Sequence, residues 1–299
     1  MPCSFDRADF ERVTTVPIIE IKDLTFQYAN SGKAALEHIH MTVEKGDFIG
    51  IIGNSGAGKS TLTYSISGVV PHHYRGDFYG EVRVAGMDTV EVRPEQLSRV
   101  VGSVFQDVDA QMVAAVVEDE LLFGLENFGV PKAEIADRMQ TAMEQVGIAD
   151  LKDRSIASLS GGQKQKVAVA AILALQPEII VLDEPTGELD PVSSRQLFEI
   201  LRELNQQHGI TILIVEQKIM LLCEYVKRLA VMEDGRLLYF DEVRRVLDHS
   251  AELRRIGIHV PRIVSLKEAM QAAGLPVGMP PVSIPQAKAM VEEVLSCSN

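Results

Sequence analysis

Residues 48–60 read Phe48-Ile49-Gly50-Ile51-Ile52 and then Gly53-Asn54-Ser55-Gly56-Ala57-Gly58-Lys59-Ser60. The second part matches the pattern G-x-x-x-x-G-K-[ST], in which glycines let the backbone curl until its N–H groups point at phosphate oxygens. By residue frequencies this pattern arises by chance in roughly one chain in a hundred of this length. Its place directly after an apolar strand makes chance, or a glycine-rich turn without a ligand, the weaker explanation. The stretch therefore predicts a buried strand, a phosphate-binding loop and a helix that begins near Lys59 and adds its positive end to the loop.

The sequence on both sides of this loop indicates an α/β fold. Continuous rather than alternating apolar runs of strand length are typical of strands covered on both faces of a parallel sheet. After residue 164 such runs alternate with amphipathic helices, which predicts βαβ units in a single doubly wound sheet. The predicted order is a helix to 175, a strand at 179–182, a helix at 193–207, a strand at 210–215, a helix, and a strand at 228–232. Two amphipathic strands, 18–28 and 39–43, come earlier, after a loose arm at 1–16.

Two segments stand apart from this alternation. Residues 108–165 are predicted to be an inserted helical subdomain, with helices at 118–125 and 132–146. Residues 1–244 then form the main domain and residues 245–299 a C-terminal extension. In the extension, Ser265-Leu266-Lys267-Glu268 and Ser283-Ile284-Pro285-Gln286 are capping-box patterns, each predicting the start of a short helix. These helices either pack back on the core or make a dimer contact, and both alternatives stay open.

Composition narrows the classes of partner. With 29 Lys and Arg against 42 Asp and Glu, the net charge of −13 argues against general affinity for nucleic acid. It also argues against docking on an anionic membrane through charge alone. No stretch approaches the roughly 20 continuous apolar residues needed to span a bilayer, so membrane association is expected to run through a protein partner. The three cysteines, Cys3, Cys223 and Cys297, lie far apart and indicate neither a metal site nor a disulfide framework, which favours a reducing cytosol.

Two adjacent carboxylates, Asp183 and Glu184, end the strand predicted at 179–182. Taken alone, they are consistent with ordinary solvated charge. With a phosphate loop on the same sheet, the economical interpretation is that Asp183 holds Mg²⁺ through water and Glu184 polarises the attacking water. Lys59 is expected to reach the β- and γ-phosphates, and Ser60 to offer its hydroxyl to the metal.

The discriminating element is Leu159-Ser160-Gly161-Gly162-Gln163, which lies before that strand. A Ser-Gly-Gly turn that opens a helix is a second anion site of backbone N–H groups. Here the chain resembles the ABC ATPase family, whose signature is this LSGGQ. The resemblance covers roughly residues 18–243 and continues with Gln106 at the Q-loop, Leu189-Asp190 at the D-loop and Tyr28 at the position of the aromatic that stacks on adenine.

The resemblance implies a P-loop NTPase (RecA-like) core with an antiparallel β subdomain, an inserted helical signature subdomain and a small C-terminal extension. It implies that two subunits sandwich ATP head to tail, with the phosphate loop of one facing the signature of the other. ATP then closes the dimer, hydrolysis opens it, and the motion drives an attached membrane protein through the region around the Q-loop. The expected partners are a second ABC ATPase subunit, identical or a related paralogue, and transmembrane transporter subunits, but no nucleic acid. The expected location is the cytoplasmic face of the cell membrane, bound peripherally.

Residue by residue, the predicted site has four parts. The catalytic residues are Lys59, Gln106, Glu184 and Gln217. The Mg²⁺ residues are Ser60, Gln106 and Asp183, the last through water. The residues facing the partner's ATP are Ser160, Gly161, Gly162 and Gln163. The residues that contact the chain's own ATP are Tyr28, Gly53, Asn54, Ser55, Gly56, Ala57, Gly58, Lys59, Ser60 and Thr61.

A narrower resemblance concerns the type of transporter. The segments Phe105-Gln106-Asp107-Val108-Asp109-Ala110-Gln111 and Val117-Glu118-Asp119-Glu120-Leu121-Leu122-Phe123-Gly124-Leu125-Glu126-Asn127 look like the energy-coupling factor importers. The loop Val70-Pro71-His72-His73-Tyr74-Arg75-Gly76 and the proline-containing extension are also similar to that group. Such importers carry vitamins or transition-metal ions, and a separate membrane protein selects the substrate. His72 and His73 have no third ligand nearby in the sequence, so an exposed loop pair is the better interpretation of them than a metal site.

One position departs from the family. Where the family has a histidine after the strand at 210–215, this chain has Gln217, and no histidine lies between His208 and His249. Glutamine can donate a hydrogen bond to a γ-phosphate but cannot carry charge or change protonation. A tolerated replacement and a weakened catalytic site are both open. Gln217 keeps open a poorly hydrolysing, regulatory ABC subunit. A soluble non-transport ABC ATPase and an exporter rather than an importer are separate rival functions.

Overall fold

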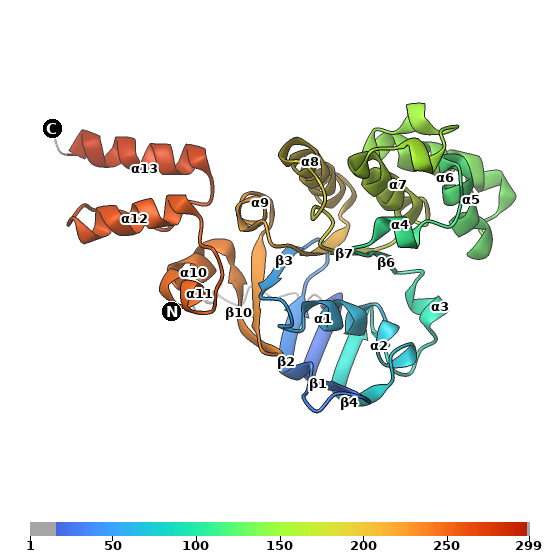
Figure 1. Cartoon of the computed structure of the whole chain (residues 1–299), viewed down its shortest axis with the longest axis horizontal. Helices are drawn as coiled ribbons and strands as arrows, with labels where there is room; N and C mark the ends of the chain where they lie inside the picture. The colour runs from blue at the N-terminus through green and yellow to red at the C-terminus, as the bar shows by residue number, and fades with distance from the viewer. Residues whose placement is uncertain (1–15, 298–299) are drawn as a thin grey trace, which may run out of the picture.

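The computed structural model describes residues 16–297 as two β-sheets and their covering helices (Figure 1). The arm predicted at 1–16 lies outside this range except for residue 16, and Cys3 lies outside it. One sheet is mainly parallel and the other is antiparallel. The parallel sheet has the order β10 (Arg236–Glu242), β9 (Arg228–Glu233), β3 (Phe48–Gly53), β8 (Thr211–Val215), β7 (Ile179–Asp183) and β6 (Val101–Val104), and β10 runs antiparallel to β9. The antiparallel sheet has the order β2 (Leu36–Val43), β1 (Ile19–Tyr28), β4 (Gly76–Val84) and β5 (Met87–Asp88).

The predicted α/β core is confirmed, and its strands are buried on both faces. In β7, Ile179 and Val181 belong to the apolar cluster between the two sheets, whereas Ile180 and Leu182 belong to the cluster on the opposite face. Side chains alternate along a strand, so a continuous apolar run is what a strand between two layers needs. Helix α1 (Lys59–Ile66) contacts both sheets, while α8 (Pro191–His208) and α9 (Ile219–Tyr225) cover the other face of the parallel sheet. Two short helices, α2 (Val69–His72) and α3 (Pro94–Leu97), lie in the chain between β3 and β6.

The inserted helical segment is also present. It consists of α4 (Val108–Gln111), α5 (Val117–Asn127), α6 (Lys132–Val146) and α7 (Gly161–Ala174), with 3₁₀ turns at Ala149–Leu151 and Ile156–Ser158. The two helices predicted at 118–125 and 132–146 are α5 and α6. On α6, Met139 and Val146 are buried, as their spacing on one helix face requires. Helix α7 packs against α4, α5 and α6 and also contacts β6, so it joins the helical layer to the sheet.

The C-terminal extension begins inside a packed region. Helix α10 (Val243–Asp248) crosses the boundary predicted at 244/245, and α11 (Ser250–Arg255) follows it. The buried side chains of both helices belong to the main core, which continues as far as Val264. Helices α12 (Arg262–Ala272) and α13 (Ile284–Cys297) contact each other and project away from the sheets (Figure 1). No helix among residues 16–297 is long and apolar enough to cross a membrane.

The two capping-box predictions had different outcomes. The one at 265–268 was wrong, because α12 begins three residues earlier, directly after Pro261. Ser265 and Glu268 instead accept hydrogen bonds from the Arg254 guanidinium, which ties α12 to α11. The second pattern does precede a helix. Ser283 Oγ accepts from the Gln286 N–H at 3.5 Å, at the start of α13.

Candidate nucleotide site

The phosphate loop joins β3 to α1, and its glycines are required by close approaches of backbone. A Cβ at Gly53 would lie 2.4 Å from the Met232 carbonyl oxygen, and one at Gly58 would lie 2.5 Å from the Ala35 carbonyl oxygen. Gly58 also has φ +96, in the left-handed region that favours glycine. A Cβ at Gly56 would meet nothing within 4 Å among residues 16–297, so this side of the loop is open. The loop thus packs closely against neighbouring backbone at Gly53 and Gly58, and it is open at Gly56.

Lys59 is buried and its ammonium group is held by the loop that it belongs to. Its Nζ donates to the carbonyl oxygens of Gly53 at 2.9 Å and Asn54 at 3.0 Å. A buried ammonium must have its protons satisfied by acceptors. Both acceptors are backbone oxygens, which can give way to phosphate oxygens when a nucleotide binds. The loop therefore holds a positive charge at the place where anionic oxygens are expected.

Asp183 ends β7 beside the start of α1, and the Ser60 hydroxyl donates to its carboxylate. Burial raises the pKa of Asp183 above its usual range, and the charge of Glu184 adds to this rise, whereas the Ser60 hydrogen bond and Lys59 act in the opposite direction. No cluster of three or more His, Cys, Asp or Glu side chains suited to a metal lies within residues 16–297. Mg²⁺ bound with a nucleotide needs only one or two protein oxygens besides phosphate and water. A hydroxyl and a buried carboxylate in contact fit such an ion.

Glu184 follows Asp183 and lies between two glutamines from distant parts of the chain. Gln217 Nε2 donates to both carboxylate oxygens of Glu184, at 3.0 Å each. Gln106 Nε2 approaches one of the same oxygens at 3.4 Å. Glu184 also has φ +47, a left-handed backbone that is uncommon outside glycine and is often found at functional sites. The structure thus brings together three of the four residues predicted to be catalytic.

Tyr28 lies at the end of β1, next to α1. Its hydroxyl and the Thr61 hydroxyl are 3.0 Å apart, so the ring is oriented toward the helix that follows the phosphate loop. The ring is half-buried and meets Phe26 and Tyr74 edge-on, with centroids 4.8 and 6.1 Å away. Tyr74 in turn stacks on Tyr64 of α1. Tyr28 is therefore one member of an aromatic group. The predicted contact with adenine would use the part of the Tyr28 ring that Phe26 and Tyr74 do not cover.

The predicted signature forms the start of α7. Ser160 Oγ accepts from the Gln163 N–H at 3.3 Å, and Gln163 Oε1 accepts from the Ser160 N–H at 2.9 Å. This reciprocal pair is a capping box, which leaves the N–H groups of the two glycines at the helix start for a ligand. In Figure 1, α7 lies above the strands β7 and β6 and α1 lies below them. The two anion sites of one chain are thus built on different layers.

Comparison with known proteins agrees with this geometry. The family model described as ABC transporter matches residues 36–187. This chain belongs to the ABC transporter ATP-binding family. An energy-coupling factor transporter ATP-binding protein, EcfA1 of Lacticaseibacillus paracasei, is 38% identical over 258 residues, which are 86% of this chain and 91% of the relative.

Two further ABC proteins are similar along most of their length. A Pyrococcus horikoshii protein, provisionally named an ABC transporter ATP-binding protein, is 37% identical over 86% of this chain and 91% of its own. The solved structure of cbiO1 from Clostridium perfringens, described as part of the ABC transporter complex cbiONQ, is 31% identical with a TM-score of 0.72. It covers 84% of this chain and 99% of the solved one. These likenesses confirm the family resemblance and the fold predicted from the motifs.

Sequence reasoning on this ABC subunit missed a contact between the phosphate loop and the C-terminal extension. Asn54 Nδ2 donates to the carbonyl oxygen of Ile256, at the end of α11. Gly257 follows with φ +81, and a Cβ there would lie 3.1 Å from Asn54 Nδ2. The extension is thus in direct contact with the loop predicted to bind ATP. The unusual φ of Gly257 cannot be read from sequence, although a glycine after a short helix is a recognised end signal.

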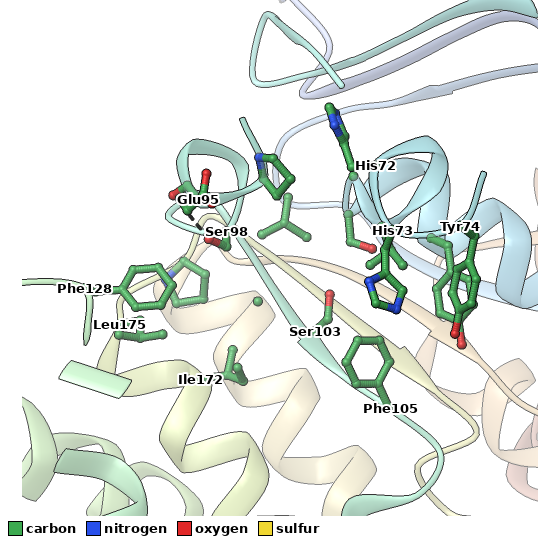
Figure 2. A pocket seen from close by; sticks show the side chains of 18 residues that line it. His72, His73, Tyr74, Glu95, Ser98, Ser103, Phe105, Phe128, Ile172 and Leu175 are labelled. Atoms are coloured by element: carbon green, nitrogen blue, oxygen red, sulfur yellow. Dashed lines mark hydrogen bonds between the residues drawn. The ribbon is translucent and has the colours of Figure 1, made fainter. Parts of the chain in front are cut away.

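A hollow lies beside the predicted nucleotide residues, between α2, α3 and the helices α5 and α7. Figure 2 shows His73, Tyr74 and Phe105 along one side of it and Phe128, Ile172 and Leu175 along the other. Its volume is about 760 Å³. Phe105 directly precedes Gln106, so a group seated in this hollow would be next to the predicted Q-loop. His72 and His73 are exposed, as predicted, and His72 Nε2 lies 2.8 Å from the Thr89 carbonyl oxygen.

Proposed function

We propose that this chain is the ATP-binding and ATP-hydrolysing subunit of an ABC-type importer. The observation that carries the proposal is the convergence of Gln106 and Gln217 on the Glu184 carboxylate, at the end of β7, which β8 separates from the phosphate-loop strand β3. A carboxylate at this place can orient a water molecule toward a bound phosphate. Gln217 donates to both oxygens of Glu184, and Gln106 supplies an amide from the segment that borders the hollow of Figure 2.

Several residues would bind the nucleotide. The backbone N–H groups of the phosphate loop and the Lys59 ammonium would contact the phosphates, and Tyr28 would stack on the base. Ser60, Gln106 and Asp183, the last through water, would hold Mg²⁺. When bound, Mg²⁺ neutralises charge on the phosphate oxygens. Burial raises the pKa of Asp183 and the Lys59 charge lowers it, so a bound Mg²⁺ would act on this carboxyl in the same direction as Lys59.

The active unit is proposed to be a head-to-tail pair with an identical subunit or a related paralogue. Each chain carries a phosphate loop and a signature, and Figure 1 places their helices α1 and α7 on different sides of the sheet strands. A second subunit would bring its own signature segment to the phosphate loop of the first. The C-terminal helices α12 and α13, which project from the core, remain a proposed dimer contact.

The transmembrane partner is proposed to bind in the hollow of Figure 2, beside Gln106. Its aromatic and aliphatic walls fit an apolar segment, and a bound segment could sense movement of the Q-loop. The segments around 105–111 and 117–127, together with the similarity to EcfA1, favour an energy-coupling factor type of importer for a vitamin or a transition-metal ion. The subunit would then be peripheral, on the cytoplasmic face of the membrane. A poorly hydrolysing, regulatory subunit is the second candidate, and Gln217 is the observation that favours it.

The hydrolytic proposal is tested by measuring Mg²⁺-dependent ATP binding and hydrolysis by the full chain and by Lys59→Ala. Because Lys59 is the side-chain cation held inside the loop, the substitution should abolish tight binding. Lys45→Ala is the matched control, since Lys45 makes an exposed ion pair with Glu178 at the other end of β3. Unchanged ATP affinity in Lys59→Ala would refute the assignment of this loop.

The transport proposal is tested by mass spectrometry of the complex purified from membranes. A membrane protein should accompany the natural chain. Tyr74→Ala, in the hollow, should lower its retention, whereas Tyr79→Ala, an exposed tyrosine on β4, should not. Recovery of a soluble complex without any membrane protein would favour a non-transport ABC ATPase.

A further inference from the structure

The turn 185–190 connects two parts of the proposed mechanism. It starts directly after Glu184 and leads into α8. Near its end, the Leu189 side chain lies against the start of α7, where a Cβ at Gly161 would be 3.7 Å from Leu189 Cδ2. The same turn therefore contacts the acid that serves the chain's own ATP and the signature that would serve the partner's ATP. Any displacement of the turn would affect both.

Lys218 holds this turn at three points. Its Nζ donates to the carbonyl oxygen of Thr186 at 2.6 Å, to the carbonyl oxygen of Leu189 at 3.1 Å and to Ser194 Oγ at 2.9 Å. An ammonium group has three protons, so these three acceptors can use all of them. Two acceptors lie in the turn itself, and the third lies in the first turn of α8.

The two residues before Lys218 act on the same region. Glu216 is buried, and its Oε1 accepts from the Thr186 N–H at 2.9 Å. Gln217 holds the carboxylate of Glu184. The segment 216–218 therefore binds both the catalytic acid and the backbone that follows it. Thr186 is fixed through its N–H by Glu216 and through its carbonyl by Lys218.

We propose that Lys218 is a positioning residue for hydrolysis, which fixes the turn 185–190 and thereby the placement of Glu184 and of the signature contact at Leu189. This inference rests on the proposed ATPase function. The left-handed backbone of Glu184 is costly for a non-glycine residue and persists only where its surroundings determine it. The three bonds of Lys218 are part of those surroundings. The Leu189 N–H also donates to the Thr186 carbonyl at 3.1 Å, so loss of the ammonium should loosen the turn rather than unfold it.

The test compares the natural chain with Lys218→Met, which keeps the length of the side chain and removes the ammonium. Turnover of ATP should fall about ten- to a hundredfold, because small misplacement of a catalytic group has effects of that order. KM for ATP should stay within about twofold, since the phosphate loop is untouched. Amide hydrogen exchange should become faster in the peptide covering 184–190 and stay unchanged in the peptide covering the phosphate loop. Lys218→Arg should restore part of the turnover, because a guanidinium can reach the same carbonyls.

Lys45→Met is the matched control and should leave turnover and exchange unchanged. If Lys218→Met does not fold, Ser194→Ala provides the second test. It removes one acceptor of Lys218 and the 3.4 Å bond from Ser194 Oγ to the Leu189 carbonyl, so a smaller fall in turnover and faster exchange at 184–190 are expected. Natural turnover in the folded variants would overturn the role of Lys218, as would lower turnover without a change in exchange at 184–190. Absence of hydrolysis by the natural chain would instead refute the proposed function.

Discussion

At the scale of single residues, the site is defined by the hydrogen-bond donors that surround the Glu184 carboxylate. The amide of Gln217 faces this carboxylate, at the position where the family resemblance predicts a histidine. Its Nε2 donates to both oxygens at 3.0 Å. Glutamine remains a neutral donor at all pH values, whereas histidine can gain a charge near neutral pH. The contact keeps Glu184 oriented but gives it no positive partner.

We expect Gln217→His to raise ATP turnover by the isolated protein about tenfold. Loss of one well-placed transition-state donor costs on the order of 10²–10³ in rate, and glutamine retains part of that contribution. ATP affinity should hardly change, because Lys59, the loop backbone and Tyr28 are untouched. Steady-state hydrolysis and nucleotide binding give the two values. Gln140→His is the control, since Gln140 donates to the exposed Glu144 on α6. Equal turnover of the natural chain and Gln217→His would show that glutamine serves this position adequately.

We expect Asp183→Asn to raise the melting temperature of the nucleotide-free protein at pH 7 while abolishing Mg²⁺-dependent hydrolysis. Burial raises the pKa of Asp183, so its ionised form destabilises the folded state above that raised pKa, and a neutral amide removes the cost. The gain should shrink as pH falls through the raised pKa of the folded state, and it should vanish below the ordinary aspartate value of 3.8, where the carboxyl is neutral in both states.

Thermal unfolding between pH 4 and pH 8 measures this difference. Asp241→Asn is the control of opposite sign, because the Glu242 N–H and Arg245 lower the pKa of Asp241. Its substitution should lower stability at neutral pH. A melting temperature of Asp183→Asn below that of the natural chain at pH 7 would contradict the prediction.

At the scale of elements, the C-terminal extension divides into a packed part and a projecting part. Helices α10 and α11 contribute Val246, Leu247 and Leu253 to the main core, and the turn after them contacts the phosphate loop. Helices α12 and α13 contact each other, and the buried side chains Ala287 and Val294 lie on α13. The boundary predicted at 244/245 was placed where the sheet ends, and it falls before most of the packed part. The residue composition of short helices packed on a core does not differ from that of the core helices, so it does not mark a boundary after them.

We expect a chain that ends after residue 260, which loses only Val264 of the buried main-core residues, to remain folded and a chain that ends after residue 244 to unfold. The shorter chain loses several fully buried aliphatic side chains, and each such loss costs about 2–5 kcal/mol. The sum is comparable with the roughly 5–15 kcal/mol that stabilises a typical domain, so little or no stability should remain. Circular dichroism and thermal unfolding report the outcome. A cooperative transition at the natural temperature in the chain ending at 244 would support a domain boundary at 244/245.

At the scale of the whole molecule, the proposed mechanism needs two copies or two related chains. The phosphate loop follows β3 and the signature opens α7, and these lie in different layers of one subunit. The turn 185–190 lies near both layers, because it follows β7 and its Leu189 side chain lies beside the first glycine of α7. Closure around ATP is therefore expected to be a property of the pair rather than of one chain.

We expect Glu184→Gln to bind ATP but to remain as a closed dimer. The substitution preserves shape and removes the carboxylate that orients water. Light scattering with ATP and Mg²⁺ should show the mass of the 32.9 kDa chain double, with dissociation when the nucleotide is removed. The double variant Lys59→Ala, Glu184→Gln is the control and should not respond to ATP. Full hydrolysis by Glu184→Gln would place the catalytic acid elsewhere.

The sequence by itself determined the local elements whose residues carry their own physical reason. The loop 53–60 needs glycines where backbone approaches backbone, the runs 48–52 and 179–182 need apolar residues on both faces, and Ser160 with Gln163 forms a helix cap from neighbours in the chain. These features are local, so residue types and spacing suffice to predict them. The antiparallel sheet was less accessible, because its strand β4 has exposed and buried residues in an irregular order.

Tertiary structure decided which distant residues meet. Gln106, Glu184 and Gln217 lie on three different segments, and only the order of β6, β7 and β8 in the sheet brings their side chains together. The contacts of Lys218 with the turn 185–190 and of Asn54 with Ile256 could likewise not be predicted, since the partners in them are backbone carbonyls that any residue could supply. Pro261 and the Arg254 contacts also fixed the start of α12, overriding a local capping pattern at Ser265. Long-range pairing depends on the packed sheet, and the sequence of one segment does not contain it.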